Sequence, residues 1–324
     1  MTKGSVVVVA YNSGQQIEGC LEALRGLVDW EVLLVDNASS DNTLQRTRRF
    51  DYVRCVANSE NRGFAAAVNQ AVRLATGNVI VVLNPDAIAA PGTLDVLAQA
   101  LHQPGVAAAG GLLLGSDGQP QRGFLVRRFP ALCAMMCEIL LLNRVWPANP
   151  CNRSYRCLDM DCTVPQEVEQ PAGAAFAFLR TAWDEIGGMA ESFYPVWFED
   201  VDFCRRLHAR GWKIMFCPGA VFRHAGGHSV AQMPFRKQQL VWYGNLLRYF
   251  RKYHPGWRVG VLRAAVLAGM LLRASVVLLS GGGEGERYWE TIRAYLSVAW
   301  RIGIRGSRSP ERASELAASS RMQP

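Results

Sequence analysis

Polar side chains follow each of four short apolar runs in the N-terminal part of the chain. They are Tyr11 and Asn12, Asp36 and Asn37, Asn61 with Arg62 and Gly63, and Asn84 with Asp86. Amide and carboxylate oxygens can bind a base edge, a ribose or a hard cation, and a glycine at a helix start lets a phosphate approach the backbone. Each of these residues is also an ordinary turn former, so it is their repetition at four strand ends that predicts a nucleotide-binding cleft.

The elements that would position these side chains alternate along residues 5–110. Short β-branched runs predict strands, and the periodic apolar residues between them predict helices. The expected strands are 5–10, 31–36, 52–57 and 79–84, and the expected helices are about 14–27, 41–49, 63–75 and 91–102. In the first helix Ser13 and Gln16 have the spacing of a capping box and Val28 lies on the apolar face, while Gly77 is expected to end the third helix. This alternation is typical of an α/β fold with a mainly parallel sheet, which binds ligands beyond the carboxyl ends of its strands.

The middle and the end of the chain carry weaker signals. We expect an irregular region over 111–170, with one apolar helix near 131–145 and a mobile loop at about 148–165. Further strands are expected at 172–180 and 213–218, and further helices at 181–186, 199–210, 236–253, 257–279 and 286–302. The predicted organisation is an α/β domain over 1–235, a helical C-terminal region over 236–306 and a disordered tail over 307–324.

Composition excludes several classes of protein. Half of the 324 residues are hydrophobic and 19% are charged, which supports a buried core and excludes a mostly disordered chain. No uninterrupted apolar run reaches about 18 residues, so we do not expect a multispan membrane protein. The first apolar run is too short for a signal peptide, and a cytoplasmic location is expected. The nine cysteines include no CxxC pair, and the spacing of Cys151, Cys157 and Cys162 matches no common metal site.

Two common nucleotide motifs are missing from the chain. No GxGxxG follows the first strand, and no GxxxxGK[ST] is present, which disfavours a dinucleotide site and a P-loop. Seven other motifs occur in order over residues 5–230, and together they resemble family 2 glycosyltransferases of the GT-A fold, most of all the rhamnosyltransferase-like group. They are AYNSG (10–14), VDNASSDNT (35–43), NRGFAAAVNQA (61–71), LNPDA (83–87), AGAAFAFLR (172–180), FEDVDFCRRLHARGW (198–212) and HAGGHS (224–229).

The resemblance implies that the strand ends bind a nucleotide-diphosphate sugar. Asp36 would accept a hydrogen bond from the pyrimidine N3–H, and the loop that begins at Asn37 would hold the ribose. Arg62 and Gly63 would contact the diphosphate, because a helix N-terminus presents free N–H groups and a partial positive charge. Helix capping and a solvated arginine are the structural alternatives. The whole implied donor site is Ala10, Tyr11, Asn12, Asp36, Asn37, Asn61, Arg62, Gly63, Asn84, Asp86, Gly173 and Ala174.

The resemblance also implies a divalent cation, Mg²⁺ or Mn²⁺, at the diphosphate. Asn84-Pro85-Asp86 occupies the place of the family's DxD motif, and Asp86 supplies a carboxylate of the kind that hard cations prefer. His224 matches the family's metal-ligand histidine, although a single histidine is more often structural. Because one carboxylate binds a metal weakly, most other ligands should be diphosphate oxygens and water.

A pair of acids at the start of the helix at 199–210 matches the family's catalytic position. Inverting transfer needs one carboxylate to deprotonate the acceptor hydroxyl, and the resemblance gives that role to Asp200 and the orientation of the acceptor to Glu199. The alternative is that both acids only suit the helix dipole, and Asp202 has a local explanation in pairing with Arg205 or Arg206. The chain departs from the family at Glu169-Gln170-Pro171 and at GGMAE (187–191), which leaves the substrate open.

Charge is unevenly distributed along the chain. The net charge is +8, yet the segment from Arg236 to the end carries 15 Lys and Arg against 5 Asp and Glu, a balance of +10. Such a segment suggests an anionic partner, and because no nucleic-acid module is recognisable, a membrane surface is expected rather than nucleic acid. Arginines within 257–279 disfavour a membrane span. An interfacial helix with Trp242 and Trp257 as anchors is expected, and a helix packed on the domain is the alternative.

The resulting hypothesis is an inverting, metal-dependent glycosyltransferase. Its donor would be a nucleotide-diphosphate sugar, with dTDP-rhamnose as a candidate, and its acceptor a hydroxyl of a glycan or lipid-linked glycan in cell-surface polysaccharide synthesis. It would work at the cytoplasmic face of the membrane, and a homodimer is a further candidate assembly. A sugar-nucleotide nucleotidyltransferase is disfavoured because no Gly-rich basic loop follows the first strand. A non-catalytic GT-A-like binding domain is disfavoured by the presence of Asp86, Asp200 and His224.

Overall fold

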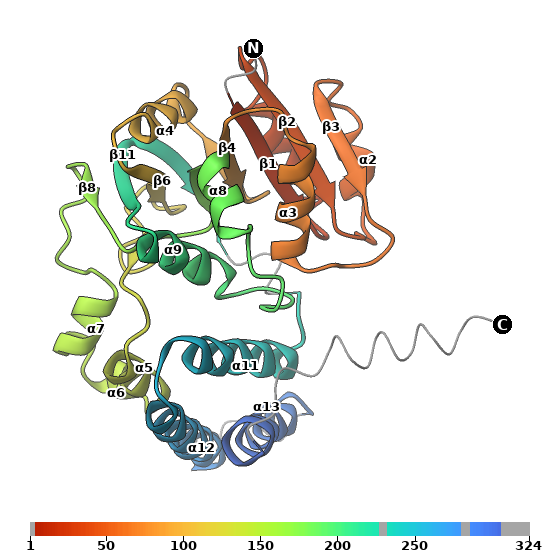
Figure 1. Cartoon of the computed structure of the whole chain (residues 1–324). Coiled ribbons are helices and arrows are strands. Elements are labelled where there is room, and N and C mark those ends of the chain that lie inside the picture. Colours follow the sequence, from red (N-terminus) through yellow and green to blue (C-terminus); the bar gives the residue numbers. More distant parts are fainter. Residues whose placement is uncertain (1–3, 227–231, 280–285, 306–324) are drawn as a thin grey trace. The chain divides into compact units, whose positions relative to one another are not determined.

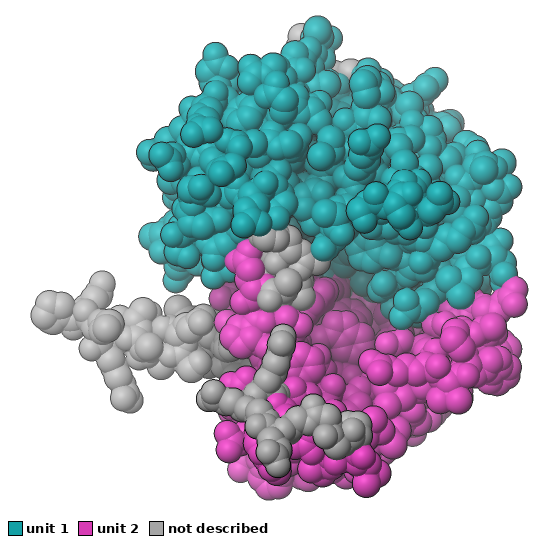
Figure 2. Space-filling view, turned by 180° about the vertical axis from the view of Figure 1, so that it is seen from behind, with its two compact units in different colours: residues 1–129, 154–191, 199–231 teal, residues 130–153, 192–198, 232–324 magenta. Residues whose placement is uncertain are grey.

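The computed structural model describes residues 4–226, 232–279 and 286–305. The chain divides into two compact units (Figure 2). The first unit consists of residues 1–129, 154–191 and 199–231, and the second consists of residues 130–153, 192–198 and 232–324. The second unit is thus built from the C-terminal helices together with two segments from the middle of the chain. The expected tail at 307–324 lies outside the described residues.

A mixed sheet forms the centre of the first unit (Figure 1). Within the described residues it has nine strands, with β8 pairing on β11 beside the order β3-β2-β1-β4-β10-β6-β11-β5. Their bounds are β1 (Gly4–Ala10), β2 (Trp30–Asp36), β3 (Val53–Ala57), β4 (Val79–Leu83), β5 (Ala87–Ala89), β6 (Val106–Leu114), β8 (Gln166–Glu167), β10 (Ala175–Leu179) and β11 (Lys213–His224). A separate pair joins β7 (Val126–Arg127) to β9 (Gln170–Pro171).

Strand direction brings the expected polar residues to one edge. Strands β1 to β4 are all parallel to one another, and β10 is antiparallel to both β4 and β6. Strand β6 therefore runs in the same direction as β1 to β4, and β11 is parallel to β6. The predicted α/β fold with a mainly parallel sheet and C-terminal helices is confirmed.

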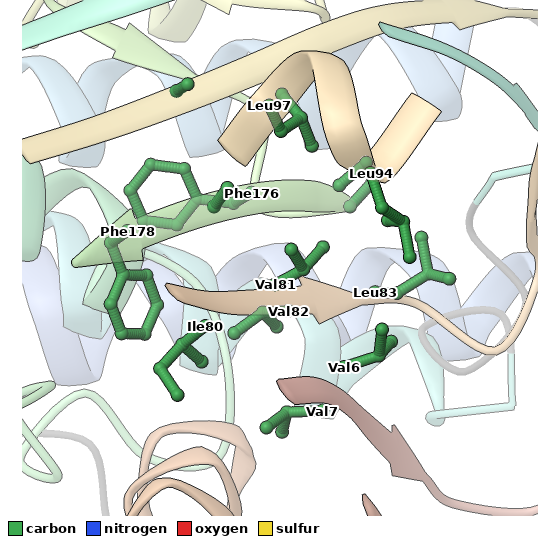
Figure 3. Packing of buried hydrophobic residues seen from close by; sticks show 14 of the residues in the cluster. Val6, Val7, Ile80, Val81, Val82, Leu83, Leu94, Leu97, Phe176 and Phe178 are labelled. Atoms are coloured by element: carbon green, nitrogen blue, oxygen red, sulfur yellow. The ribbon is translucent and has the colours of Figure 1, made fainter. Parts of the chain in front are cut away.

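Helices cover the sheet and close its core. In the first unit they are α1 (Ile17–Glu22), α2 (Thr43–Thr47), α3 (Phe64–Leu74), α4 (Thr93–Leu101), α8 (Arg180–Ile186) and α9 (Glu199–Ala209), and α7 (Pro150–Tyr155) crosses the boundary between units. Figure 3 shows Val81 and Leu83 of β4 close to Leu94 of α4, and Phe176 of the adjacent strand beside them. All of these side chains are buried, as are those of β1 on both faces, which explains the continuous apolar runs.

Several local expectations are wrong, each for a physical reason. The first helix is shorter than expected, and Ser13 bonds within its own loop at Tyr11 instead of forming a capping box. Val28 is exposed because the helix ends before it. Gly77 is not a helix cap. A Cβ there would lie 2.5 Å from the Gly4 backbone, so a glycine is needed for the segment at Gly77 to pack closely against the start of β1.

The middle of the chain is more regular than expected. Residues 106–114 form a central strand, β6, which the apolar pattern did not indicate. The expected loop at 148–165 contains α7, and the expected helix near 131–145 is divided at Leu141 into α5 (Leu132–Ile139) and α6 (Leu142–Val145). The last strand passes Pro218 through a bulge and continues to His224.

Helices make up the second unit. They are α5 and α6, then α11 (Phe235–Tyr253), α12 (Gly256–Leu279), α13 (Glu286–Val298) and its π-helical end η1 (Ala299–Ile304). Among the described residues, α12 alone is long and apolar enough to cross a membrane, by length and composition only; its mean hydropathy is 1.9 and a third of that stretch is buried.

Candidate active site

Hydrogen bonds join the loops that follow β1 and β2. The Asn12 N–H donates to Ser39 Oγ at 2.8 Å, and the Ser40 N–H donates to Asn12 Oδ1 at 2.7 Å. Asn12 has a φ of +48° and Ala38 a φ of +65°, which turns both loops sharply at the strand ends. Tyr11 lies in the same joined loop and is half-buried.

Asp36 ends β2 with its carboxylate only half satisfied. Its side chain is buried, and Oδ2 accepts the Ser39 N–H at 3.2 Å. The other oxygen, Oδ1, is buried and has no hydrogen-bond partner within the described residues. A buried acceptor without a partner is costly, so this oxygen suits a ligand that donates a hydrogen bond.

Asn37 ties the end of β2 to the start of α3. Its Oδ1 accepts the Arg62 N–H at 3.0 Å, and its Nδ2 donates to Asn61 Oδ1 at 2.9 Å. Gly63 precedes the helix with a φ of +82°, which a residue with a Cβ adopts rarely. Asn37 and Asn61 are therefore engaged with each other, while Arg62 extends its guanidinium to Gln70 Oε1 at 3.2 Å.

A short contact brings the end of β4 beside the start of β10. The Asn84 N–H donates to the Ala174 carbonyl at 2.9 Å. Gly173, the preceding residue, lies against Asp200 at the N-terminus of α9, and a Cβ on Gly173 would lie 3.0 Å from Asp200 Oδ2. The packing of the Asp200 carboxylate thus requires a glycine at position 173.

Two carboxyls stand at the start of α9: Glu199 is buried and Asp200 is half-buried. Burial raises the pKa of Glu199 well above its usual range, and the charge of Asp200 raises it further. Glu199 Oε2 has no partner in the part of the chain that the structure describes. Burial also raises the pKa of Asp200, although the Val201 N–H and the Arg127 charge oppose the rise. Asp202 is explained locally, because it pairs with Arg206 at 2.7 Å as expected.

Asp86 and His224 meet where β11 ends beside β5. His224 pairs with Ala87 in the sheet, and its Nε2 lies 3.5 Å from Asp86 Oδ1. Both side chains are almost fully buried, and Nε2 has no hydrogen-bond partner among described atoms. Burial lowers the pKa of His224 while the Asp86 carboxylate opposes this. An imidazole nitrogen and a carboxylate oxygen facing one point fit a divalent cation.

Gln121 fixes the orientation of His224 and was not identified from the sequence. Its Nε2 donates to the His224 carbonyl at 2.9 Å, so its Oε1 must accept from Nδ1–H at 3.0 Å. This tautomer leaves the lone pair of His224 Nε2 facing Asp86. Only a contact between distant segments could have identified it, because Gln121 lies in a turn-rich stretch with no motif.

Arg127 and Phe124 were also missed. Phe124 stacks parallel to the His224 ring with centroids 5.5 Å apart, and the Arg127 guanidinium lies 5.7 Å from the Phe124 ring. Arg127 also stabilises the ionised form of Asp200. These two residues therefore link the Asp86–His224 pair to the acid pair. No cluster of three or more His, Cys, Asp or Glu able to hold a metal occurs within the described ranges, and His228 lies outside them.

Comparison with known proteins agrees with this geometry. Residues 5–167 match the family described as Glycosyl transferase family 2, which covers half of the chain. The chain belongs to glycosyl transferase family 2. This glycosyltransferase is 28% identical, over 87% of its own length and 95% of the relative's, to the N-acetylglucosaminyl-diphospho-decaprenol L-rhamnosyltransferase of Mycobacterium tuberculosis. Membership of the family decides against the nucleotidyltransferase and the non-catalytic binding domain.

Two solved structures support the fold of this glycosyltransferase. The mannosyltransferase PcManGT from Pyrobaculum calidifontis, in complex with GDP-Man and Mn²⁺, has a TM-score of 0.53 at 21% identity, over 94% of this chain and 88% of that one. GalNAc-T7 with UDP, GalNAc and Mn²⁺ has a TM-score of 0.58 at 15% identity, over the whole of this chain and 59% of that one. At such identities the likeness concerns the fold, and it confirms the GT-A type.

Proposed function

We propose that this glycosyltransferase moves a sugar, with inversion, from a nucleotide-diphosphate sugar to a hydroxyl of a lipid-linked glycan in cell-surface polysaccharide synthesis. The observation that carries the proposal is the half-buried Asp200 carboxylate, which lies against Gly173 just before β10, where the next residue bonds to the end of β4. The name of the mycobacterial relative makes dTDP-rhamnose the first donor to test and an N-acetylglucosaminyl-diphospho-polyprenol the first acceptor.

In this proposal the strand ends hold the donor. The free oxygen of Asp36 accepts a hydrogen bond from the base, since it is buried and lacks a partner within the described chain. Gly63 and the N-terminal turn of α3 lie at the same sheet edge, and Arg62 and this helix end suit the diphosphate. Asn37 and Asn61 hold the loops of this donor site in place through their hydrogen bonds.

Asp200 acts as the general base. Its ionised carboxylate takes the proton of the acceptor hydroxyl as the oxygen attacks the anomeric carbon and the nucleoside diphosphate leaves. Burial raises the pKa of Asp200 and makes it a stronger base than an ordinary Asp, while the Arg127 charge favours its ionised form. Glu199, buried beside it with one free oxygen, accepts or donates a hydrogen bond to orient the acceptor.

Asp86 and His224 would hold a divalent cation, Mg²⁺ or Mn²⁺. The test of fit is the free Nε2 of His224 aimed at the Asp86 carboxylate in the described structure. When bound, the cation neutralises the charge that develops on the leaving diphosphate. Gln121 keeps His224 in the ligating tautomer.

A donor screen tests the reaction. Purified full-length protein with Mn²⁺ is mixed with UDP-, GDP- and dTDP-sugars and with an N-acetylglucosaminyl-diphospho-polyprenol acceptor, and nucleotide release and glycolipid product are measured. We expect transfer from dTDP-rhamnose that depends on acceptor. Transfer from another donor would change the proposed donor sugar and leave the proposed reaction in place. No transfer from any donor to any glycan acceptor would overturn the proposal.

A further inference from the structure

Two of the three arginines of α12 are half-buried and bond to the backbone of neighbouring helices. Arg273 donates to the backbone carbonyls of Ile139 and Glu138 at the C-terminus of α5, and Arg263 donates to those of Gly303 and Ile304 at the end of η1. Cations are favourable at helix C-termini, where carbonyls lack intrahelical partners. These two charges are therefore used inside the second unit, and they do not argue against contact between the rest of α12 and lipid.

The opposite side of α12 is exposed and apolar. Trp257 is 63% exposed, Leu271 46% and Leu272 42%, and the residues at intermediate turns are small. The exposed positions follow the helical repeat and carry no charged residue: they are Trp257, Gly260, Val261, Ala264, Ala268, Leu271, Leu272, Ser275, Val276, Leu278 and Leu279. This helix thus directs Arg263 and Arg273 toward its neighbouring helices and exposes its apolar stripe, the reverse of a helix that faces water.

A second apolar stripe runs along α13 and η1. It consists of Trp289, Leu296, Trp300 and Ile304, all about half exposed. The two helices run antiparallel, because Arg263 near the start of α12 reaches the end of η1 and Tyr288 near the start of α13 reaches the Leu278 carbonyl. Figure 1 shows α12 and α13 side by side with α11 across one side of the pair, and α11 contacts both helices. We call the exposed stripes of α12, α13 and η1 together the apolar face.

Two arginine–tryptophan pairs border the apolar face at one end, where the start of α12 lies beside the end of η1. Arg258 stacks on Trp257 at 5.2 Å and Arg305 stacks on Trp300 at 5.1 Å. Arg293 and Glu290 are both exposed on α13, while α12 contains no acidic residue. Tryptophan beside arginine at the edge of an apolar surface suits the headgroup region of an anionic bilayer.

We propose that the apolar face is the surface by which this enzyme inserts in the plane of an anionic membrane, so that a lipid-linked acceptor is met at the bilayer. This deepens the proposed function, from which the lipid-linked acceptor is taken. The sequence predicted Trp242 as an anchor. In the structure its side chain is half-buried against the rings of Phe198 and Tyr243, so it is not part of the apolar face. Trp289 and Trp300 take that place.

Flotation of the full-length protein with vesicles tests the face. Vesicles of phosphatidylcholine alone and with about a third phosphatidylglycerol are compared for the wild type, for Leu271→Ser with Leu272→Ser, and for the control Val28→Ser with Leu142→Ser, which removes exposed apolar side chains elsewhere. We expect the wild type and the control to float with anionic vesicles and the Leu271/Leu272 variant to partition at least about tenfold less.

The flotation test can be separated from the donor screen and from a loss of folding. No donor or acceptor is present in flotation, so it succeeds or fails independently of the donor screen, and thermal melting verifies that each variant folds. Equal flotation of the Leu271/Leu272 variant and the wild type would overturn the proposal. A wild type that stays in solution, or a wild-type dimer that the variant converts to a monomer without vesicles, would also overturn it and assign the face to another protein surface.

Discussion

The carboxylate of Asp200 carries the proposed chemistry, and its replacement gives the most direct test. Asp200→Asn keeps the shape of the side chain and removes the base, so donor binding should stay near wild type while turnover falls about 10²–10⁴-fold. Nucleotide release with acceptor measures turnover, and calorimetry measures donor binding. Asp184→Asn, at an exposed position of α8, is the matched control. Turnover within about threefold of wild type would reject Asp200 as the base.

The acidic limb of the pH–rate profile should report the raised pKa of Asp200. The base must be ionised, so kcat/KM falls as pH drops through this pKa, at a higher pH than an ordinary aspartate would give. Arg127→Gln removes a charge that lowers the pKa, and it should move the limb to still higher pH. Arg122→Gln, exposed in the same stretch, should not move it. A limb that shifts down in Arg127→Gln contradicts the assignment.

Gln121 offers a test of the cation site that does not depend on turnover. Gln121→Leu removes the acceptor of His224 Nδ1–H, so the ligating tautomer is no longer selected and Mn²⁺ affinity should fall about 10–100-fold. Mn²⁺ binding is measured by electron paramagnetic resonance in the presence of nucleoside diphosphate, without acceptor. Gln119→Leu, an exposed neighbour, serves as control. Unchanged Mn²⁺ binding in Gln121→Leu would make this hydrogen bond purely structural.

At the scale of elements, β6 depends on glycines that have no chemical role. A Cβ at Gly111 would lie 2.3 Å from the Ala220 carbonyl oxygen, and one at Gly110 would lie 2.2 Å from Pro171 Cβ. Gly111→Ala should therefore lower the free energy of unfolding by about 1–3 kcal/mol, as overpacking does. Gly219→Ala, whose Cβ would meet Val96 at an ordinary 3.6 Å, should have little effect in the same denaturant titration. Equal stability of the two variants would show that β11 moves away without cost.

The whole molecule should behave as a peripheral membrane protein. Anionic lipid attracts each nearby Lys or Arg by about 1 kcal/mol, and salt weakens this attraction, whereas apolar insertion does not depend on salt. Membranes from expressing cells should retain the protein in low salt, release it partly in high salt and release it fully in detergent. Complete release by salt alone would mean that the apolar face does not insert.

Residue periodicity was sufficient to predict many of the strands and helices of this protein. Strands β1 to β4 and helices α11 and α12 lie close to their predicted bounds, because each has a continuous β-branched run or a regular apolar repeat. Polar residues at consecutive strand ends indicated the sheet edge that carries Asp36 and Asp86, since parallel strands place their carboxyl ends together. Glu199 and Asp200 were expected at a helix start, and the structure has them there.

What depends on contacts between distant segments could not be predicted in this way. Strand β6 has the low-propensity sequence VAAAGGLLL, and it is a strand because β10 and β11 pair with it and because only small residues fit beside Pro171 and Ala220. Gln121 gained its partner only when β11 continued through its bulge to His224. Local sequence determines which conformation a segment prefers, whereas a hydrogen-bond partner or a close approach is set by segments far away in the chain.

The direction of the arginines in α12 shows the same limit. Composition alone indicated an apolar helix with charges that oppose lipid. The neighbouring helices decide which side of α12 carries these charges. Arg273 bonds to carbonyls at the end of α5 and Arg263 to carbonyls at the end of η1, while Leu271 and Leu272 stay exposed. The sequence by itself determined that the helix is apolar and long, and only the packing around it decided which face meets the surroundings.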